Sequence, residues 1–293
     1  MEGNPDLTKR LIVDSGSFFA RKNDVLVFGT EAWIIRTLFN ICSSLECWDV
    51  AICWDSLKSL RKEMYPEYKA NRKDDEEFSP EEWAIFNKCK ARTRKTILPE
   101  IGFANNFMQS GYEADDLIAK AIDNHYHNII ASNDHDLYQL LSDSTEIYHP
   151  LKKVHYTYQD FTSEYGIEPY EWINFKCMKG DSSDNIPGIK GIGEKRALQI
   201  IKRGAYKETS EAYFDIIDRN TKLMELPFSG CKDILWNLNQ PNQTTFEKLV
   251  DRYNLQWFYT PVGMACAKKF FEGYRATKVR KSIKIRKPHE KRT

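Results

Sequence analysis

The sequence predicts an α/β fold, in which a central, mostly parallel sheet is flanked by helices and is followed by a C-terminal helical subdomain. Three observations favour this class. Short apolar runs without alternation, typical of strands buried on both faces, occur at residues 11–13, 50–54 and 129–133. Segments with helical periodicity separate them, as parallel strands require. Beyond residue 150 the strand patterns stop and helical patterns dominate.

The expected helices follow in order along the chain. Residues 31–44 repeat apolar side chains at helical spacing between the first two strands. The sequence Ser79-Pro80-Glu81-Glu82 supplies a helix cap, a proline at the first helical position and a capping-box glutamate, so a helix is expected from 80 to about 97. Further helices are expected at 114–126, 169–180 and 194–203, of which the last two end at glycines.

These patterns divide the chain into three parts. Residues 1–150 form the α/β core, 151–274 the helical subdomain, and 275–293 a basic tail that we expect to be disordered. Within the core, the connection over about 56–106 is too long for a passive loop and is expected to be a functional element.

Composition excludes several classes of protein. Hydrophobic residues make up 41% of the chain, which is enough for a sizeable core. No apolar run approaches 18 residues, and the polar N-terminus lacks the pattern of a secretory signal. The seven cysteines contain no C-x-x-C pair, so they indicate reduced thiols. We therefore expect a monomeric cytoplasmic protein that does not bind membranes.

The net charge of +1 conceals an uneven distribution. The tail from Arg275 carries nine Lys or Arg residues against Glu290 alone, so the rest of the chain is net acidic. A basic tail is usually a solvated charge run, but it also suits docking to a replication partner. The acidic surplus indicates that carboxylates are concentrated elsewhere for a purpose.

Each of the three predicted strands is followed by an aspartate, at Asp14, Asp55 and Asp134. Further carboxylates cluster at the start of the 114–126 helix and after the 169–180 helix. The full set of candidate ligands is Asp14, Asp55, Glu113, Asp115, Asp116, Asp134, Asp136, Asp181 and Asp184. Taken singly, each cluster is explained equally well by helix capping or turn formation.

Taken together, these carboxylates are expected to converge where the parallel strands end. Like charges so close together need neutralisation, and oxygen donors without His or Cys suit Mg²⁺ or Mn²⁺. The set therefore predicts a two-ion site of the kind that hydrolyses phosphodiesters.

A second motif lies at residues 187–197, where a glycine-rich turn leads directly into a helix. Gly188, Gly191 and Gly193 let the backbone approach a ligand closely, and Lys195 and Arg196 lie in the first turn of the helix. This is the form of a helix-hairpin-helix, which grips the DNA backbone without reading sequence. In the connecting segment, Tyr68 is a candidate for stacking on bases, although packing is an equally good explanation.

With these motifs, the chain resembles the 5′-nuclease family, which includes phage 5′-exonuclease/flap endonucleases and the N-terminal domain of bacterial DNA polymerase I. The resemblance covers about residues 11–271 and is strongest at 112–117, 132–137 and 178–197. It implies a PIN-like nuclease fold and assigns all nine carboxylates to two metal ions. One departure is the first strand motif, where Ser15 stands in the place of a glycine that often follows the aspartate in the family.

The resemblance further implies that Lys69 and Arg72 contact the scissile phosphate and that the hairpin can hold a K⁺ ion. Three residues apart, Lys69 and Arg72 would share a face if their segment is helical.

The expected function is a structure-specific 5′-nuclease acting on DNA with a 5′ flap, nick or free 5′ end, with RNA primers as a further substrate in replication or repair. Two alternatives stay open. One is a non-catalytic protein that binds branched DNA, and the other is a PIN-like single-strand ribonuclease. The complete set of carboxylates disfavours the first, and the hairpin disfavours the second.

Overall fold

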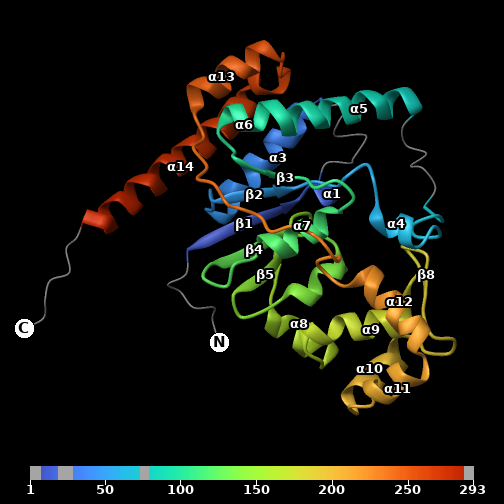
Figure 1. Cartoon of the computed structure of the whole chain (residues 1–293). Coiled ribbons are helices and arrows are strands. Elements are labelled where there is room, and N and C mark those ends of the chain that lie inside the picture. Colours follow the sequence, from blue (N-terminus) through green and yellow to red (C-terminus); the bar gives the residue numbers. More distant parts are fainter. Residues whose placement is uncertain (1–7, 19–28, 73–78, 287–293) are drawn as a thin grey trace, which may run out of the picture. The chain divides into compact units, whose positions relative to one another are not determined.

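The computed structural model describes residues 8–18, 29–72 and 79–286 (Figure 1). The described residues fall into two compact units. The first comprises 8–18, 51–72 and 107–236, together with Ser79, and the second comprises 29–50, 80–106 and 237–286.

The central sheet has the strand order β3-β2-β1-β4-β5-β6 within the described residues. Its strands are β1 (Lys9–Asp14), β2 (Val50–Cys53), β3 (Asn105–Phe107), β4 (His127–Ala131), β5 (Thr145–His149) and β6 (Val154–Tyr156). β4 pairs in parallel with both β1 and β5, and β6 returns antiparallel to β5. The register pairs Val13 with Ala131, so the residues that follow β1 and β4 meet at one edge of the sheet.

The predicted α/β class is therefore confirmed. The helical segments of the first unit are α1 (Ser15–Phe18), α4 (Leu60–Met64), α7 (Ala114–Ala121), η2 (His135–Leu140), α8 (Tyr158–Tyr165), η3 (Pro169–Glu171), α9 (Trp172–Lys179), α10 (Glu194–Lys202), α11 (Tyr206–Ala212) and α12 (Phe214–Met224). A two-stranded ribbon, β7 (Gly180–Asp181) and β8 (Ile186–Pro187), follows α9.

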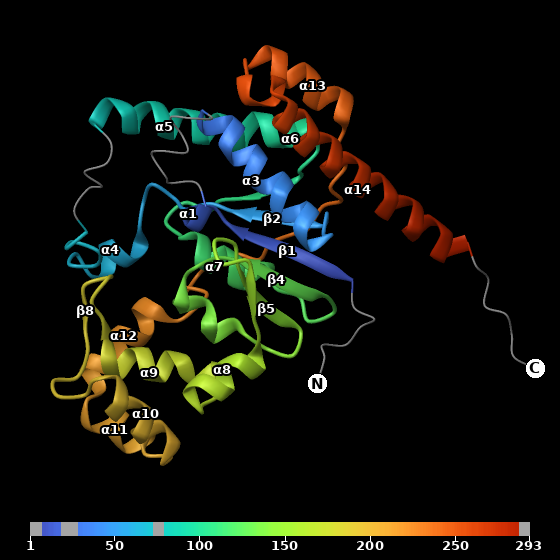
Figure 2. The same cartoon turned by 180° about the vertical axis from the view of Figure 1, so that it is seen from behind.

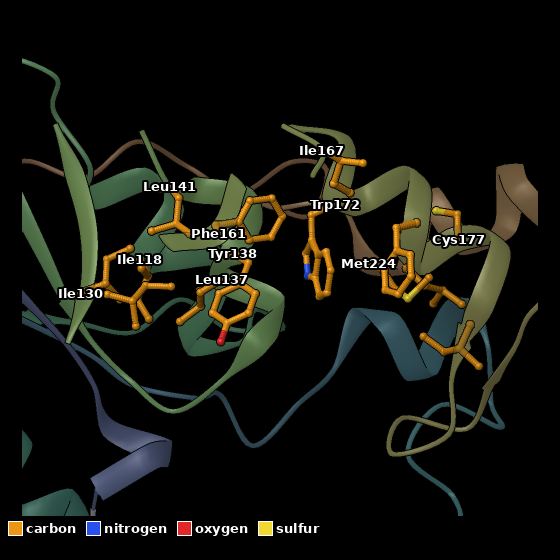
Figure 3. Packing of buried hydrophobic residues seen from close by; sticks show 14 of the residues in the cluster. Ile118, Ile130, Leu137, Tyr138, Leu141, Phe161, Ile167, Trp172, Cys177 and Met224 are labelled. Carbon is orange, nitrogen blue, oxygen red and sulfur yellow. The ribbon is translucent and has the colours of Figure 1, made fainter. Parts of the chain in front are cut away.

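One hydrophobic cluster runs through the first unit from the sheet to the glycine-rich turn. Ile130 of β4 and Ile118 of α7 lie at its sheet end, and Phe161 and Trp172 lie in its middle (Figure 3). The cluster continues to Ile192, between the glycines of the hairpin. Because one continuous core joins these elements, the strand ends and the hairpin are held by the same packing.

The helices α9, α10, α11 and α12 lie together in both views (Figures 1 and 2). The hairpin consists of α9, the β7-β8 ribbon, the glycine-rich turn and α10. Gly180 ends α9 at a φ of 78°, and a β-carbon on Gly188 would lie 2.2 Å from the carbonyl carbon of Lys179. Two chain segments pass so closely here that only glycine fits at Gly188.

The second unit contains α3 (Thr30–Leu45), α5 (Pro80–Arg92), η1 (Thr93–Ile97), α6 (Leu98–Ile101), α13 (Gln243–Arg252), η4 (Gln256–Tyr259) and α14 (Pro261–Arg286). Its core is aromatic. Phe39 of α3 stacks on Phe270 of α14 at 4.0 Å between ring centroids, and Phe246 of α13 packs against the Phe39 ring at 5.2 Å.

Several boundaries differ from expectation. The 114–126 helix ends at Ala121, and the 80–97 helix changes to π-helical geometry from Thr93. Residues 275–286, assigned above to a disordered tail, continue α14, since Lys, Arg and Ala are good helix formers. Residues 287–293 lie outside the described residues. Within the described part of the chain, no helix combines the length and apolar character that a membrane span requires.

Candidate functional site

Asp14 is the last residue of β1 and lies buried where the strand ends. Its Oδ1 accepts a hydrogen bond from the Gly16 amide at 2.8 Å, and its Oδ2 accepts hydrogen bonds from the hydroxyls of Ser17 and Ser132 at 2.5 and 2.7 Å. Burial raises the pKa of Asp14 and the charge of Asp55 adds to the rise, while the hydroxyl groups oppose it. This carboxylate therefore lies where its negative charge is costly.

The side chains of Asp14 and Asp55 meet beside Gly16. A β-carbon on Gly16 would lie 3.2 Å from Oδ1 of Asp14 and 3.3 Å from Oδ2 of Asp55. Gly16, one residue later than the family pattern places its glycine, thus keeps the space between the two carboxylates open. Oδ1 of Asp55 also accepts a hydrogen bond from the Ala114 amide at 3.0 Å, which ties the end of β2 to the start of α7.

Asp115, in the first turn of α7, completes this group. Its pKa is raised well above the ordinary value by burial first, and then by the charges of Asp134, Asp14 and Asp55. Among the described residues, no ion pair within 4 Å is found for Asp14, Asp55 or Asp115. Three carboxylates without a cationic side chain at salt-bridge distance are thus brought together.

Asp116 is placed differently from its neighbour. Its side chain is fully buried, and its two oxygens accept hydrogen bonds from both terminal nitrogens of Arg61, at 2.7 and 2.8 Å. The same oxygens accept from the backbone amides of Glu113 at 3.0 Å and Phe228 at 2.8 Å. The structure therefore separates Asp116 from the open carboxylates.

Two of the remaining carboxylates pair with a buried lysine, Lys176 of α9. Its ammonium group pairs with Oδ1 of Asp136 at 2.6 Å and with Asp181. Asp134 caps η2 by accepting the Asp136 amide at 2.8 Å, and Asp181 accepts the Asp184 amide at 3.2 Å. Lys176 thus connects the 3₁₀ segment after β4 with the turn after α9.

The two partners of Lys176 respond in opposite directions. Burial raises the pKa of Asp136 to about 6, because the adjacent Asp134 offsets much of the effect of Lys176. For Asp181 burial also acts to raise the pKa, but Lys176 and the hydrogen bonds of Ser183 and Asp184 outweigh it, so the pKa lies below its ordinary value. Asp181 therefore has hydrogen-bond donors besides Lys176, whereas Asp136 lies next to a second carboxylate.

Lys69 and Arg72 lie on a turn that follows α4, so the condition under which they would share a helical face is not met. Lys69 has a φ of 56°, and its amide donates to the Asp184 carbonyl at 2.8 Å, so contacts distant in sequence decide the local conformation. Nζ of Lys69 donates to Oε2 of Glu113 at 2.8 Å and lies 3.8 Å from Oδ2 of Asp184. Nη2 of Arg72 donates to Oδ1 of Asp184 at 2.5 Å. Both cations thus face the carboxylates.

Tyr68 does not present a face to bases. Its ring is 3% exposed and belongs to the hydrophobic core, and its hydroxyl donates to Oε2 of Glu113 at 3.0 Å. The packing alternative is therefore the correct one for Tyr68, because only an exposed ring can stack on a nucleotide.

A pocket of about 430 Å³ opens between these groups. Its walls bring together six of the nine predicted carboxylates with both predicted cations. They are Glu113, Asp115, Asp134, Asp136, Asp181, Asp184, Lys69 and Arg72. Asp14 and Asp55 do not line the pocket. They lie near Asp115, since their charges raise its pKa, and their side chains meet each other beside Gly16.

The donor set of this site fits a divalent cation. In the described ranges, no three His, Cys, Asp or Glu side chains already surround a common point as ligands of one ion. The side chains present are nevertheless oxygen donors, and within the described ranges no cationic side chain lies at salt-bridge distance from Asp14, Asp55 or Asp115. Mg²⁺ and Mn²⁺ take such donors, and a bound ion would offset the burial and the mutual repulsion that raise the pKa values of Asp14 and Asp115.

The hairpin residues lie outside the pocket. Gly191 has a φ of 82°, a value that favours glycine, and Gly193 caps α10 with open space where a β-carbon would stand. Lys195 and Arg196, in the first turn of α10, are exposed. These four residues thus combine an exposed glycine-rich turn with exposed basic side chains.

Sequence reasoning missed Arg61 and Lys176, which both line the pocket. Lys176 lies among the buried residues Phe175, Cys177 and Met178, and a lysine inside such an apolar stretch signals a buried partner. Arg61 opens the basic run that leads to Arg72, but the sequence does not show that it turns inward.

Comparison with known proteins adds two family matches. The N-terminal resolvase-like domain of 5′-3′ exonuclease matches residues 17–166, and the C-terminal SAM fold of 5′-3′ exonuclease matches residues 167–225.

Among curated relatives, DNA polymerase I of Thermus thermophilus is 38% identical over 148 residues, covering 49% of this chain and 16% of the polymerase. A 5′-3′ exonuclease of Halalkalibacterium halodurans is 36% identical over 194 residues, covering 63% of this chain and 61% of that protein. The chain thus aligns with less than two thirds of either relative.

Among solved structures, the T5 D15 protein co-crystallised with metal ions aligns with a TM-score of 0.60 at 22% identity, covering 90% of this chain and 97% of that chain. Flap endonuclease-1 from Methanococcus jannaschii aligns with a TM-score of 0.52 at 15% identity, covering 92% and 94%. At these identities the likeness establishes a shared fold.

The carboxylate group predicts a pH-dependent stability in EDTA. Because the folded state raises the pKa of Asp115 above 3.8, Asp115 favours folding most below pH 3.8, and this contribution is lost as pH rises through the folded pKa. One pKa unit is worth about 1.4 kcal/mol, or about 2–4 °C in Tm at this chain length. We expect Asp115→Asn to raise the Tm by at least ~3 °C at pH 8 and to leave it unchanged near pH 4.

Thermal unfolding at both pH values checks this, with the exposed Asp215→Asn as the control that should not change the Tm. A lower Tm for Asp115→Asn at pH 8 would contradict the repulsion inferred here.

Proposed function

The chain belongs to the 5′-3′ exonuclease family, and from that membership we propose that it is a divalent-metal-dependent nuclease that hydrolyses phosphodiester bonds at 5′ flaps and 5′ ends of DNA. The observation that carries the proposal is the pocket in which carboxylates face Lys69 and Arg72. An acidic pocket alone would repel DNA, and a basic pocket alone would only bind it. Both together suit hydrolysis of a phosphate ester.

Eight carboxylates would hold two ions, Mg²⁺ or Mn²⁺. Asp14, Asp55, Glu113 and Asp115 serve mainly the first, and Asp134, Asp136, Asp181 and Asp184 mainly the second. When bound, such ions supply an activated water and stabilise charge on the leaving oxygen. The hydroxyls of Ser17 and Ser132 keep Asp14 oriented through their hydrogen bonds to its Oδ2.

Lys69 and Arg72 supply positive charge at the scissile phosphate. Burial alone would lower the pKa of Lys69, but the charges of Glu113 and Asp184 raise it, so its ammonium group stays protonated. The turn is held in place by the Asn71 side chain, which donates to the Ser182 carbonyl at 2.7 Å. A cation fixed in this way needs no reorganisation as charge develops on the phosphate.

The hairpin grips the DNA duplex away from the reacting bond. The amides at the start of α10 and the exposed Lys195 and Arg196 suit a phosphate of the backbone. Backbone carbonyls of the same turn are the proposed holders of a K⁺ ion. The common core beneath the hairpin and the strand ends fixes the distance between the gripped phosphate and the cleaved one.

Removal of one metal ligand tests the catalytic role. We expect Asp134→Asn to abolish cleavage of a labelled 5′-flap duplex in Mg²⁺, and EDTA to do the same to the wild type. DNA binding should be unchanged or tighter, because repulsion of phosphate falls. Asp215→Asn should cleave normally. A parallel assay with RNA–DNA hybrids and single-stranded RNA ranks the substrates, and cleavage confined to single-stranded RNA would favour the ribonuclease alternative.

Lys69→Ala separates catalysis from attraction. We expect the single-turnover rate at saturating DNA to fall at least ~100-fold, the loss typical of one transition-state donor. The salt dependence of binding should change by no more than about one phosphate contact. Lys62→Ala, an exposed lysine on α4, is the matched control. A Lys69→Ala protein that binds weakly but cleaves at the wild-type rate once saturated would limit Lys69 to attracting DNA.

The hairpin is tested best at Gly193, because a substitution at Gly191 would strain its positive φ. A β-carbon on Gly193 meets nothing within 4 Å, so Gly193→Ala should leave the Tm unchanged. We expect it to weaken duplex binding several-fold while leaving turnover at saturating DNA intact, since the methyl group lies where a phosphate would approach. The exposed Gln199→Ala on the same helix is the control. Equal affinities would show that the turn is only structural.

A further inference from the structure

Arg61, which lines the pocket, forms a buried ion pair with Asp116. Arg61 is 3% exposed and Asp116 is fully buried. Both terminal nitrogens of the guanidinium group reach the carboxylate, at 2.7 and 2.8 Å, and Nε donates to the Leu223 carbonyl at 2.7 Å. The guanidinium carbon also lies 4.8 Å from the centre of the Phe228 ring. This is the planar, two-pronged contact that arginine makes and lysine cannot.

Asp116 has little capacity left for a metal ion. Each of its oxygens accepts one bond from Arg61 and one from a backbone amide, of Glu113 or Phe228. A carboxylate oxygen offers about two acceptor positions, so all four are in use. An ion could bind only if this buried network were first broken, which leaves Arg61 buried and unpaired.

The pair joins the two sides of the candidate active site. On one side, Arg61 lies on α4, directly before the turn that carries Lys69. On the other side, Asp116 fixes Glu113 by accepting its amide, and Glu113 in turn receives Nζ of Lys69. Arg61 also lies 3.9 Å from Oε2 of Glu113. The contact between Lys69 and Glu113 is therefore anchored at both ends by one ion pair.

We propose that Arg61 is a positioning residue of the nuclease site and that Asp116 is its anchor, not a ligand of a metal ion. The pair fixes the positions of Lys69 and Glu113 so that the ammonium group of Lys69 stays in contact with the Glu113 carboxylate. The role in cleavage rests on the proposed function, whereas the assignment of Asp116 does not. This corrects the family resemblance at one of nine positions, because Asp116 faces Arg61 and not the open carboxylates.

The experiment compares Asp116→Asn and Arg61→Met with Asp115→Asn, a proposed ligand. Mn²⁺ binding to each folded protein is measured by calorimetry without DNA. We expect Asp116→Asn and Arg61→Met to keep the wild-type number of Mn²⁺ ions, with affinities within ~3-fold, and Asp115→Asn to lose a site. Both pair variants should lower the Tm by about 10 °C, as expected when one partner of a buried pair is removed. A site lost in Asp116→Asn but kept in Arg61→Met would overturn the assignment.

Cleavage then tests positioning. At saturating flap DNA and at least 15 °C below each Tm, we expect both variants to lower the single-turnover rate ~10- to 100-fold with little change in DNA affinity. The double variant should cleave no more slowly than the slower single variant, because both disrupt one interaction. Arg61→Lys should recover stability in part but little of the rate, and it replaces Arg61→Met if that protein does not fold.

Leu249→Ala is the control for stability alone, because Leu249 is a fully buried core residue of the second unit. It should lower the Tm by a similar amount without slowing cleavage. Wild-type rates in Arg61→Met and Arg61→Lys would reduce the pair to a purely structural role. Absence of cleavage in the wild type would refute the proposed nuclease, while the Mn²⁺ and Tm results would still decide what Asp116 binds.

Discussion

Repulsion between carboxylates is the constraint on which the rest of the first unit depends. Parallel strands bring their last residues to one edge, so Asp14 and the residues after β4 are forced together. Burial makes this costly, and the raised pKa values of Asp14 and Asp115 express the cost. Several neighbouring groups reduce this cost. They include hydroxyls on Asp14, a helix amide on Asp55 and cationic side chains on the acids farther from the sheet.

The cations divide the carboxylates into two kinds. Arg61 and Lys176 are buried, and each is committed to carboxylates that it neutralises within the protein. Lys69 and Arg72 are more exposed and reach into the pocket from a turn. For Asp14, Asp55 and Asp115, the part of the chain that the structure describes offers no cationic side chain at salt-bridge distance. Arg61 and Lys176 thus balance the charge of their carboxylates within the protein. At the carboxylates for which chemistry is proposed, the repulsion is not balanced in this way, and such sites commonly trade stability for function.

The fold and the inner strand ends were predictable because their signals are local. An unalternated apolar run defines a buried strand, a capping box defines the start of a helix, and Gly188 reports a close backbone approach. These signals placed β1, β2, β4, α5 and α10 within a few residues, and parallel pairing then predicted that Asp14, Asp55 and Asp134 would converge. The glycine-rich turn was likewise identifiable, since positive φ and open backbone demand glycine at Gly191.

The partner of each charge was decided only by the tertiary structure. Arg61 meets Asp116 across 55 positions of sequence, and Arg72 meets Asp184 across 112. No local period reports such contacts, so the sequence did not distinguish among the nine carboxylates. The fold pairs Asp116 with Arg61 and pairs Asp136 and Asp181 with Lys176. In the same way, the sequence left open whether the segment of Lys69 and Arg72 is helical, and whether Tyr68 stacks on bases or packs in the core. Contacts with the 181–185 turn and with Glu113 impose a tight turn and a buried ring instead, because distant hydrogen bonds outweigh the weak local preference of so short a segment.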